Sequence, residues 1–419
     1  MKAFLLIGLA CGLMLTHSTL AQLPPAIKPG AERLTAYLPL LKGKTVAVFA
    51  NQTSMVGNTH LVDTLLARGV AIKKIFAPEH GFRGDADAGE HVANGTDAKT
   101  GLPIVSLYGT HRKPAPAEVA DVDIIVFDVQ DVGLRYYTYI SSLEELMEVA
   151  LENNKPLLIL DRPNPNGFYV DGPVLEDGFK SFVGMQKVPV VYGMTIGEYA
   201  MMLQGERWLN KAANTKVSYN IKQKPTADTP FHVLVIKCEN YTNKSRYLLP
   251  QKPSPNLPNM QSIWLYSSTC YFEGTEISLG RGTDKPFQLY GHPAFADTLY
   301  QFTPVSTPGA KNPPLKNKPC YGYDLSKLPI DVTKPAWQKI NLSFLLNAYQ
   351  LFPNKDSFFL RPAKTNPKSS DYFFNKLAGN DKLMWQIMNG YTETEIRKSW
   401  EPGLAAFRKI RAKYLLYAD

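Results

Sequence analysis

The chain has 419 residues, of which 44% are hydrophobic and 20% are charged. This composition is typical of a globular protein and excludes a fibrous or largely disordered chain, and the length predicts two domains. The 46 basic residues outnumber the 37 acidic ones, which gives a net charge of +9, but the sequence has no Lys/Arg cluster and no aromatic RNA-binding motif. Nucleic acid is therefore not expected as a partner.

Residues 1–21 have the pattern of a secretory signal peptide. Lys2 precedes an apolar run, and the small residues that end at Ala21 fit a cleavage site. We expect an exported protein of the periplasm or cell envelope, whose net charge falls from +9 to +8 when Lys2 is removed. Cys11 lies too early in the apolar run for a good lipidation site, and no later segment has the ~20 apolar residues of a membrane span. Residues 22–36 are expected to form a leader.

The first half of the chain alternates between two patterns. Short β-branched, apolar runs predict buried strands at 44–50, 72–77, 102–108, 122–129 and 155–161. Amphipathic patterns predict helices at 59–68, 141–153 and 194–203. This alternation predicts an α/β fold with a Rossmann-like, doubly wound, mostly parallel sheet. We expect it to span residues 37–215.

Two of these helices carry a predicted capping box, in which a hydroxyl residue is followed three positions later by glutamate. The pairs are Ser141 with Glu144 and Thr195 with Glu198. The segment after the first strand, ANQTSMVGN, lacks a GxGxxG fingerprint, so a dinucleotide is not expected and no cofactor is predicted.

The pattern changes after residue 215. Proline-rich and aromatic segments surround a short predicted strand at 231–239, and helices are expected at 341–352 and 381–414. These features predict a second, α+β domain over residues 216–419. Its cysteines, three in number and widely spaced, do not form a disulfide framework or a zinc motif. The sequence leaves open whether two of them form a disulfide or all three are buried free thiols.

Ionisable side chains gather on the loops that follow the predicted strands, where open α/β sheets bind their ligands. The richest loop is FAPEHGFRGDADAGE, residues 76–90. Glu79 is the candidate proton donor, because partial burial under neighbouring phenylalanines favours a protonated carboxyl. Glu90 is either a second catalytic carboxylate or a partner of Arg83. His80 is either a base or a hydrogen-bonding support, and here a structural role for a single histidine is the more common one.

The loop QDVGLRYYTYISS, residues 130–142, mixes carboxylates, an arginine and tyrosines. Asp131 is a candidate catalytic carboxylate, and Arg135 and Tyr137 are candidate substrate-binding residues. Asn164, in the DRPNPNG loop, is a further candidate substrate-binding residue. Aromatic rings that stack on sugar faces, beside polar groups that bind hydroxyls, suit a carbohydrate. Some of the tyrosines are equally expected in the core.

A counterpart lies in the second half, in YFEGTEISLGRGTDKPFQ, residues 271–288. Glu273 is a further candidate catalytic carboxylate, and Glu276 and Arg281 are candidate substrate-binding residues. Glycines on both sides of Arg281 allow a close approach of the backbone to a ligand. A guanidinium binds a carboxylate through two hydrogen bonds. Arg281 and the two arginines named above are therefore candidates for holding an acidic group of the substrate.

Other enzyme classes are disfavoured. The sequence has no GxSxG elbow, no HExxH and no CxxC motif. No metal site is predicted. A site for a divalent metal stays open as an alternative, because four aspartates are available: Asp85, Asp87, Asp128 and Asp131.

Several long motifs of the chain occur together in one known family. They are APEHGFRGDADAGE, TGLPIVSLYG, DVQDVGLRYYTYISS, LDRPNPNG with VDGP, GMTIGEYA, PSPNLP and FEGTEISLGRGTDKPFQ. From about residue 40 to the C-terminus, the chain resembles the exo-β-N-acetylmuramidase (NamZ-like) family, which was long described only as a domain of unknown function.

The resemblance implies a Rossmann-like domain joined to a second domain, with the active site in the cleft between them. It implies an exported glycosidase that removes N-acetylmuramic acid from non-reducing ends of peptide-free peptidoglycan fragments. It also implies a catalytic glutamate in the first-domain loop, matched here by Glu79, with Glu90 second. The second group would be Glu90, Asp131 or Glu273, as base or nucleophile, or the 2-acetamido group of the sugar.

Two other functions remain open. One is a non-catalytic protein that binds cell-wall sugars. The other is a metal-dependent hydrolase of an acyl or phosphoryl bond, which would be sensitive to EDTA. The residues alone support only an exported hydrolase or binder of a polar ligand such as a carbohydrate.

Overall fold

The computed structural model describes residues 25–79, 81–83, 94–217 and 231–419. The predicted signal peptide, His80 and Glu90 lie outside these residues.

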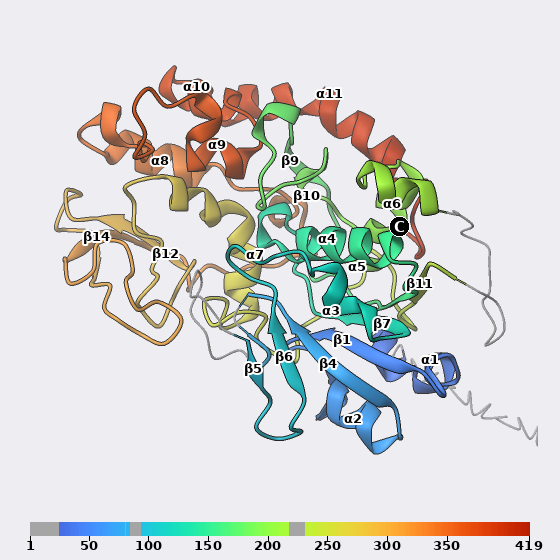
Figure 1. Cartoon of the computed structure of the whole chain (residues 1–419). Coiled ribbons are helices and arrows are strands. Elements are labelled where there is room, and N and C mark those ends of the chain that lie inside the picture. The colour runs from blue at the N-terminus through green and yellow to red at the C-terminus, as the bar shows by residue number, and fades with distance from the viewer. Residues whose placement is uncertain (1–24, 80, 84–93, 218–230) are drawn as a thin grey trace, which may run out of the picture.

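A seven-stranded sheet forms the centre of the first part of the chain (Figure 1). Its order is β11 (Val233–Ile236), β8 (Leu157–Leu160), β7 (Ile124–Asp128), β1 (Thr45–Ala50), β4 (Ala71–Ala77), β6 (Pro103–Ser106) and β5 (Gly95–Thr96). All neighbours are parallel except the edge strand β5. The chain builds outward from β1 in both directions, which confirms the predicted doubly wound α/β fold. Such a sheet places its ligand site where the two directions diverge, at the carboxyl ends of the strands.

Helices cover both faces of this sheet, as Figure 1 shows. On one face lie α1 (Leu34–Leu41) and α2 (Leu61–Ala67); on the other lie α4 (Tyr139–Glu152) and α5 (Ile196–Gly205). Strand β7 shows why: Ile124 and Val126 join the core under α1 and α2, whereas Ile125 and Phe127 join the core under α4 and α5. Because successive side chains of a strand point to opposite faces, a continuous apolar run requires cover on both sides. The short helices α3 (Pro116–Ala120) and α6 (Lys211–Lys216) complete this part.

The second part combines helices with a small antiparallel sheet. Its strands are β12 (Leu289–His292), β14 (Cys320–Asp324) and β13 (Tyr300–Phe302), in that spatial order. Its helices are α7 (Met260–Thr269), α8 (Ser343–Leu351), α9 (Phe373–Ala378), α10 (Lys382–Met388) and α11 (Glu393–Arg411). One hydrophobic cluster runs from the α4 face of the large sheet into these helices, so the two parts share a core.

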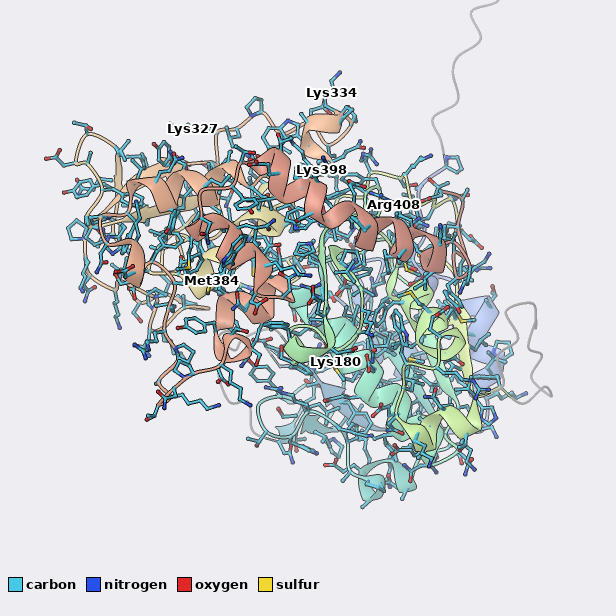
Figure 2. The ribbon with its side chains drawn as sticks, turned by 90° about the horizontal axis from the view of Figure 1, so that it is seen from above. Lys180, Lys327, Lys334, Met384, Lys398 and Arg408 are labelled. Atoms are coloured by element: carbon cyan, nitrogen blue, oxygen red, sulfur yellow. The ribbon has the colours of Figure 1, made fainter. Side chains whose placement is uncertain are left out.

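The hairpin of β9 (Asp171–Val174) and β10 (Pro189–Val191) lies beneath α11 and ties the parts together. Figure 2, seen from above, shows α11 crossing this surface with Lys398 and Arg408 labelled on it. Arg397 of the same helix donates to both oxygens of the buried Asp171 carboxylate, at 2.9 and 2.8 Å. This buried contact fixes the C-terminal helix against the first part.

Some local predictions need correction. The capping box of Thr195 and Glu198 is confirmed. The box of Ser141 and Glu144 is wrong, because α4 already begins at Tyr139 and both side chains point into packed surroundings. The Ser141 hydroxyl donates to the Phe182 carbonyl, and Glu144 accepts from the side chain of Gln186.

Strand β11 also differs from expectation, since it pairs with β8 in the large sheet although it was assigned to the second domain. Its strand signal was correct, but sequence does not show which sheet a strand joins. The three described cysteines, Cys238, Cys270 and Cys320, are buried free thiols. Among the described residues, no helix is long and apolar enough to cross a membrane.

Candidate active site

A pocket of about 940 Å³ lies between the carboxyl edge of the large sheet and the second part of the chain. The sheet contributes residues that follow three strands: Glu79 after β4, Tyr108 after β6, and Tyr136–Tyr139 after β7. The second part contributes residues around α7 and the turn that follows it, together with Leu360 and Phe373. The structure therefore brings Glu79, from the first carboxylate-rich segment, into one cavity with Glu273 and Glu276, from the second.

Glu79 enters the pocket two residues after β4. The Tyr108 hydroxyl donates to its Oε1 at 2.8 Å. Tyr108 in turn follows β6, the strand that pairs with β4, so the parallel register of the two strands places donor and acceptor side by side. The hydrogen bond fixes the orientation of a half-buried carboxyl at the edge of the sheet.

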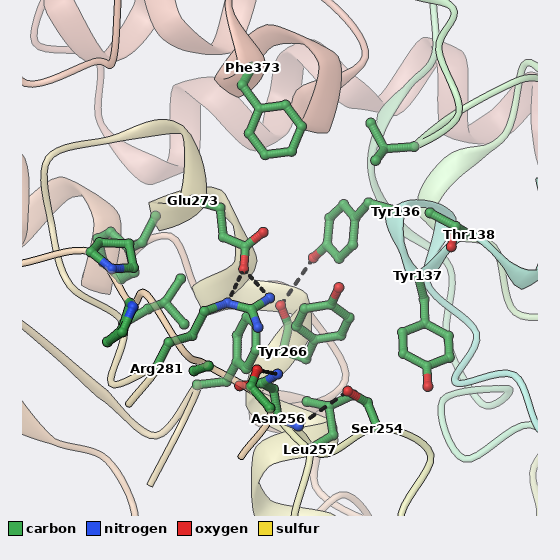
Figure 3. A pocket seen from close by; sticks show the side chains of 18 of the residues that line it. Tyr136, Tyr137, Thr138, Ser254, Asn256, Leu257, Tyr266, Glu273, Arg281 and Phe373 are labelled. Atoms are coloured by element: carbon green, nitrogen blue, oxygen red, sulfur yellow. Dashed lines mark hydrogen bonds and ion pairs between the residues drawn. The ribbon is translucent and has the colours of Figure 1, made fainter. Parts of the chain in front are cut away.

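Glu273 and Arg281 form an ion pair on the opposite side. One oxygen of Glu273, Oε1, accepts from Nε of Arg281 at 2.7 Å and from Nη2 at 2.5 Å. Figure 3 shows this pair at the centre of the pocket, with Phe373 above it and Tyr266 beside it. Burial alone would lower the pKa of Arg281, but the Glu273 carboxylate outweighs that effect and the pKa is raised. The ion pair therefore fixes the Glu273 carboxyl in place inside the pocket.

The glycines on either side of Arg281 are required by the backbone. Gly280 and Gly282 have φ values of +83° and +78°, in the left-handed region that favours glycine. A Cβ atom would also lie 2.7 Å from the Lys285 carbonyl oxygen at the first position and 2.4 Å from that of Val305 at the second. This tight loop is what turns the arginine back toward Glu273.

Glu276 is the third carboxylate of the pocket. Its backbone N–H donates to the Phe358 carbonyl at 3.0 Å, which places the residue after the turn that holds Glu273. The side chain has no hydrogen-bond or ion-pair partner within the described ranges. It is therefore available to a ligand.

Aromatic rings make up much of the remaining wall. Tyr136 donates its hydroxyl to the carbonyls of Tyr266 and Ser267, and Tyr137 donates to the Pro253 carbonyl at 2.7 Å. The ring of Tyr266 packs edge-on against those of Tyr136 and Phe287, at 5.3 and 4.7 Å. With the hydroxyls bound to backbone, the rings provide rigid apolar surfaces of the kind that stack on sugars.

Arg135 does not reach the pocket. It is 0% exposed, and its guanidinium donates to the backbone carbonyls of Pro173, Val188 and Leu377. Burial lowers its pKa to about 10. The residue joins the β9–β10 hairpin to α9 and has no access to a substrate, contrary to its prediction as a substrate-binding residue.

Three further candidates lie elsewhere. Asp131 is buried, accepts from the Tyr192 hydroxyl and the Gly133 amide, and has its pKa raised to about 6 by burial. Asn164 donates to the Met194 carbonyl at 2.7 Å. Arg83 donates to both carboxylate oxygens of Asp97, at 3.1 and 2.8 Å. None of the three candidates lines the pocket, so these post-strand side chains stabilise loops.

The pocket also contains residues that sequence reasoning did not select. Among them are Tyr108, Arg112, Phe182, Asn256 and Phe373. Tyr108 occupies the same post-strand position as Glu79, so the strand-end rule could have found it. Arg112, Phe182 and Asn256 come from irregular segments and Phe373 begins α9, and their proximity depends on tertiary packing.

Two family models match almost the whole chain. Residues 46–261 match the N-terminal domain, and residues 264–417 the C-terminal domain, of exo-β-N-acetylmuramidase NamZ. The chain belongs to the NamZ family. This membership confirms the family and the enzyme class, a glycosidase, that the motifs predict. The junction of the two models, near residue 262, follows the large sheet and precedes most of α7.

Relatives of the NamZ family align over nearly the full length. The peptidoglycan β-N-acetylmuramidase NamZ of Bacillus subtilis is 36% identical over 410 residues, which cover 94% of this chain and 92% of the relative. Two crystal structures of DUF1343 family proteins from Bacteroides fragilis share the fold, with TM-scores of 0.81 and 0.74 and identities of 45% and 29%. Each comparison covers 94% of this chain and all of the other.

Proposed function

We propose that this protein is an exported, exo-acting glycosidase that releases N-acetylmuramic acid from non-reducing ends of peptidoglycan fragments, with Glu79 as general acid. The observation that carries the proposal is that Glu79, Glu273 and Glu276 line one pocket together with several aromatic rings. The named activity of the Bacillus subtilis relative supports the substrate class. The signal-like pattern of residues 1–21 supports export to the cell envelope.

Glu79 is suited to donate a proton to the glycosidic oxygen. A protonated carboxyl accepts the Tyr108 hydrogen bond on its carbonyl oxygen and keeps its own O–H for the leaving group. Glycosidases need one such acid and, in most families, a second carboxylate on the other side of the scissile bond. Glu79, the acid, follows a strand of the large sheet, and the second carboxylate belongs to the second part of the chain.

Glu273 is suited to the second role. Its ion pair with Arg281 holds one oxygen, Oε1, and leaves the other for the substrate or for water. As a carboxylate it would act as a base toward water or as a nucleophile, and it would stabilise the positive charge that develops on the sugar ring. Of the three carboxylates predicted for this role, Asp131 is too deeply buried for it, Glu90 lies outside the described residues, and Glu273 lines the pocket.

We expect the purified protein to cleave a MurNAc-GlcNAc disaccharide at the same rate with and without EDTA. The reason is that the proposed acid and base are carboxyls alone. Two of the four aspartates considered as metal ligands already have protein partners: Asp128 binds Arg162, and Asp131 binds Tyr192. In the ranges that the structure describes, no group of three or more His, Cys, Asp or Glu is placed to hold a metal. Asp85 and Asp87 lie outside the described residues.

The measurement is the initial rate of sugar release by mass spectrometry, before and after dialysis against EDTA. Loss of cleavage that a divalent ion restores would support a metal-dependent hydrolase instead. Binding of the disaccharide with no cleavage under either condition would support a sugar-binding protein.

A further inference from the structure

The arginines that sequence reasoning offered for an acidic group of the substrate are already engaged. Arg83 binds the Asp97 carboxylate, Arg135 is enclosed among backbone carbonyls, and Arg281 binds Glu273. An anionic group that enters the pocket would have to compete with these partners, whereas a cation without an ion-pair partner would bind it directly.

Arg112 is that cation. It lines the pocket and is exposed, in the segment that continues from Tyr108. Its Cζ atom lies 4.2 Å from the centre of the Phe182 ring, in a cation–π contact. In the part of the chain that the structure describes, the guanidinium has no hydrogen-bond or ion-pair partner.

The stacking geometry matters for binding. A ring contact occupies the face of a guanidinium but leaves the N–H groups at its edge directed outward, in the plane where a carboxylate accepts two hydrogen bonds. Phe182 thus holds Arg112 in place without using its donors, which lowers the entropy cost of binding a ligand.

Neighbouring charges do not satisfy Arg112. Arg112 acts electrostatically on Glu145 and tends to lower its pKa, but the two do not form an ion pair. Burial outweighs the arginine and raises the pKa of Glu145. Glu79 accepts from Tyr108. Lys311, a further cation of the pocket, already takes part in an interaction within the protein.

We infer that Arg112 binds the lactyl carboxylate of the substrate sugar and so selects N-acetylmuramic acid over N-acetylglucosamine. The two sugars differ only in this lactyl ether, so a group that recognises its carboxylate is sufficient for the choice. The same short segment carries Tyr108, which orients Glu79, and therefore links recognition of the lactyl group to placement of the acid. This inference rests on the proposed function and names the residue that determines its specificity.

The kinetic test compares aryl β-N-acetylmuraminide with aryl β-N-acetylglucosaminide. We expect Arg112→Gln to lower kcat/KM for the muraminide by about 10- to 100-fold, the loss of one bidentate, charge-assisted contact, and to leave the glucosaminide rate unchanged. Arg112→Lys should retain part of the preference, because it keeps the charge but not the fork. Lys398→Gln, which removes one positive charge from an exposed site on α11, is the matched control and should change neither rate (Figure 2).

Methyl esterification of the lactyl group completes a double-mutant cycle. Wild type should lose on the ester what Arg112→Gln loses on the acid, and the variant should not distinguish ester from acid. Equal effects of Arg112→Gln on both sugars, or no effect on either, would overturn the inference.

A binding measurement separates this inference from the proposed function. By calorimetry, wild type should bind free N-acetylmuramic acid more tightly than N-acetylglucosamine, and Arg112→Gln should bind both alike. This outcome supports the role of Arg112 even in a protein that cleaves neither glycoside. If wild type cleaves the muraminide and Arg112→Gln keeps the same preference for it, the role of Arg112 is refuted. The proposed glycosidase function would be unaffected by that result.

Discussion

Replacing Glu79 by glutamine should lower kcat on the MurNAc-GlcNAc disaccharide by about 10²- to 10⁴-fold, the range expected for loss of a general acid. The amide has the same shape and still accepts from Tyr108, but it has no proton to give to the glycosidic oxygen. The fold should be unchanged, because Glu79 lines a pocket and is not part of the core.

The leaving group distinguishes an acid from a residue that merely shapes the pocket. An aryl glycoside with a weakly basic phenol leaves without protonation, so Glu79→Gln should retain most of its activity on that substrate. Glu401→Gln, an isosteric change at a carboxylate 63% exposed on α11, is the matched control. Equal losses on both substrates would argue against proton donation by Glu79.

The largest effect on stability is expected from Arg162→Met. Arg162 donates to both oxygens of Asp128, at 2.6 and 2.8 Å, and Asp128 is 0% exposed at the end of β7. Removing the arginine leaves a buried carboxylate without its cation, and this should lower the free energy of unfolding by about 3–5 kcal/mol. Urea denaturation followed by fluorescence measures the change.

The double variant Asp128→Leu with Arg162→Met is the control for that prediction. It removes both charges, so it should be more stable than Arg162→Met alone, even though it also loses the hydrogen bonds of the pair. If the single variant proved at least as stable as the double, the pair would not be a buried ion pair of the expected kind.

The sheet and the position of the pocket could be predicted because they depend on local patterns. Apolar, β-branched runs identified the parallel strands, and the strand-end rule placed Glu79 at the carboxyl edge. The second segment, with Glu273, Glu276 and Arg281, was selected by its own residues. That the two segments face each other followed only from the family resemblance, because tertiary contacts over about 200 positions leave no local signal.

The candidates that failed did so for the same reason. Arg135, Asp131 and Asn164 follow strands as Glu79 does, but all three are buried. Their hydrogen-bond partners come from distant segments: Leu377 for Arg135, Tyr192 for Asp131 and Met194 for Asn164. A residue at a strand end can bind a ligand only where no other segment covers it. Arg112 shows the converse, since its exposure and its contact with Phe182 depend on a loop 70 positions away.

Peptide-free glycan chains with a defined non-reducing end test exo-acting muramidase activity most directly. Purified wild type should release N-acetylmuramic acid from chains that begin with that sugar, and should release monosaccharide at least about tenfold more slowly from chains that begin with N-acetylglucosamine. Mass spectrometry of the products over time gives the answer. Release of internal fragments, or intact chains of both kinds after prolonged incubation, would contradict the assignment of this pocket to an exo-acting muramidase.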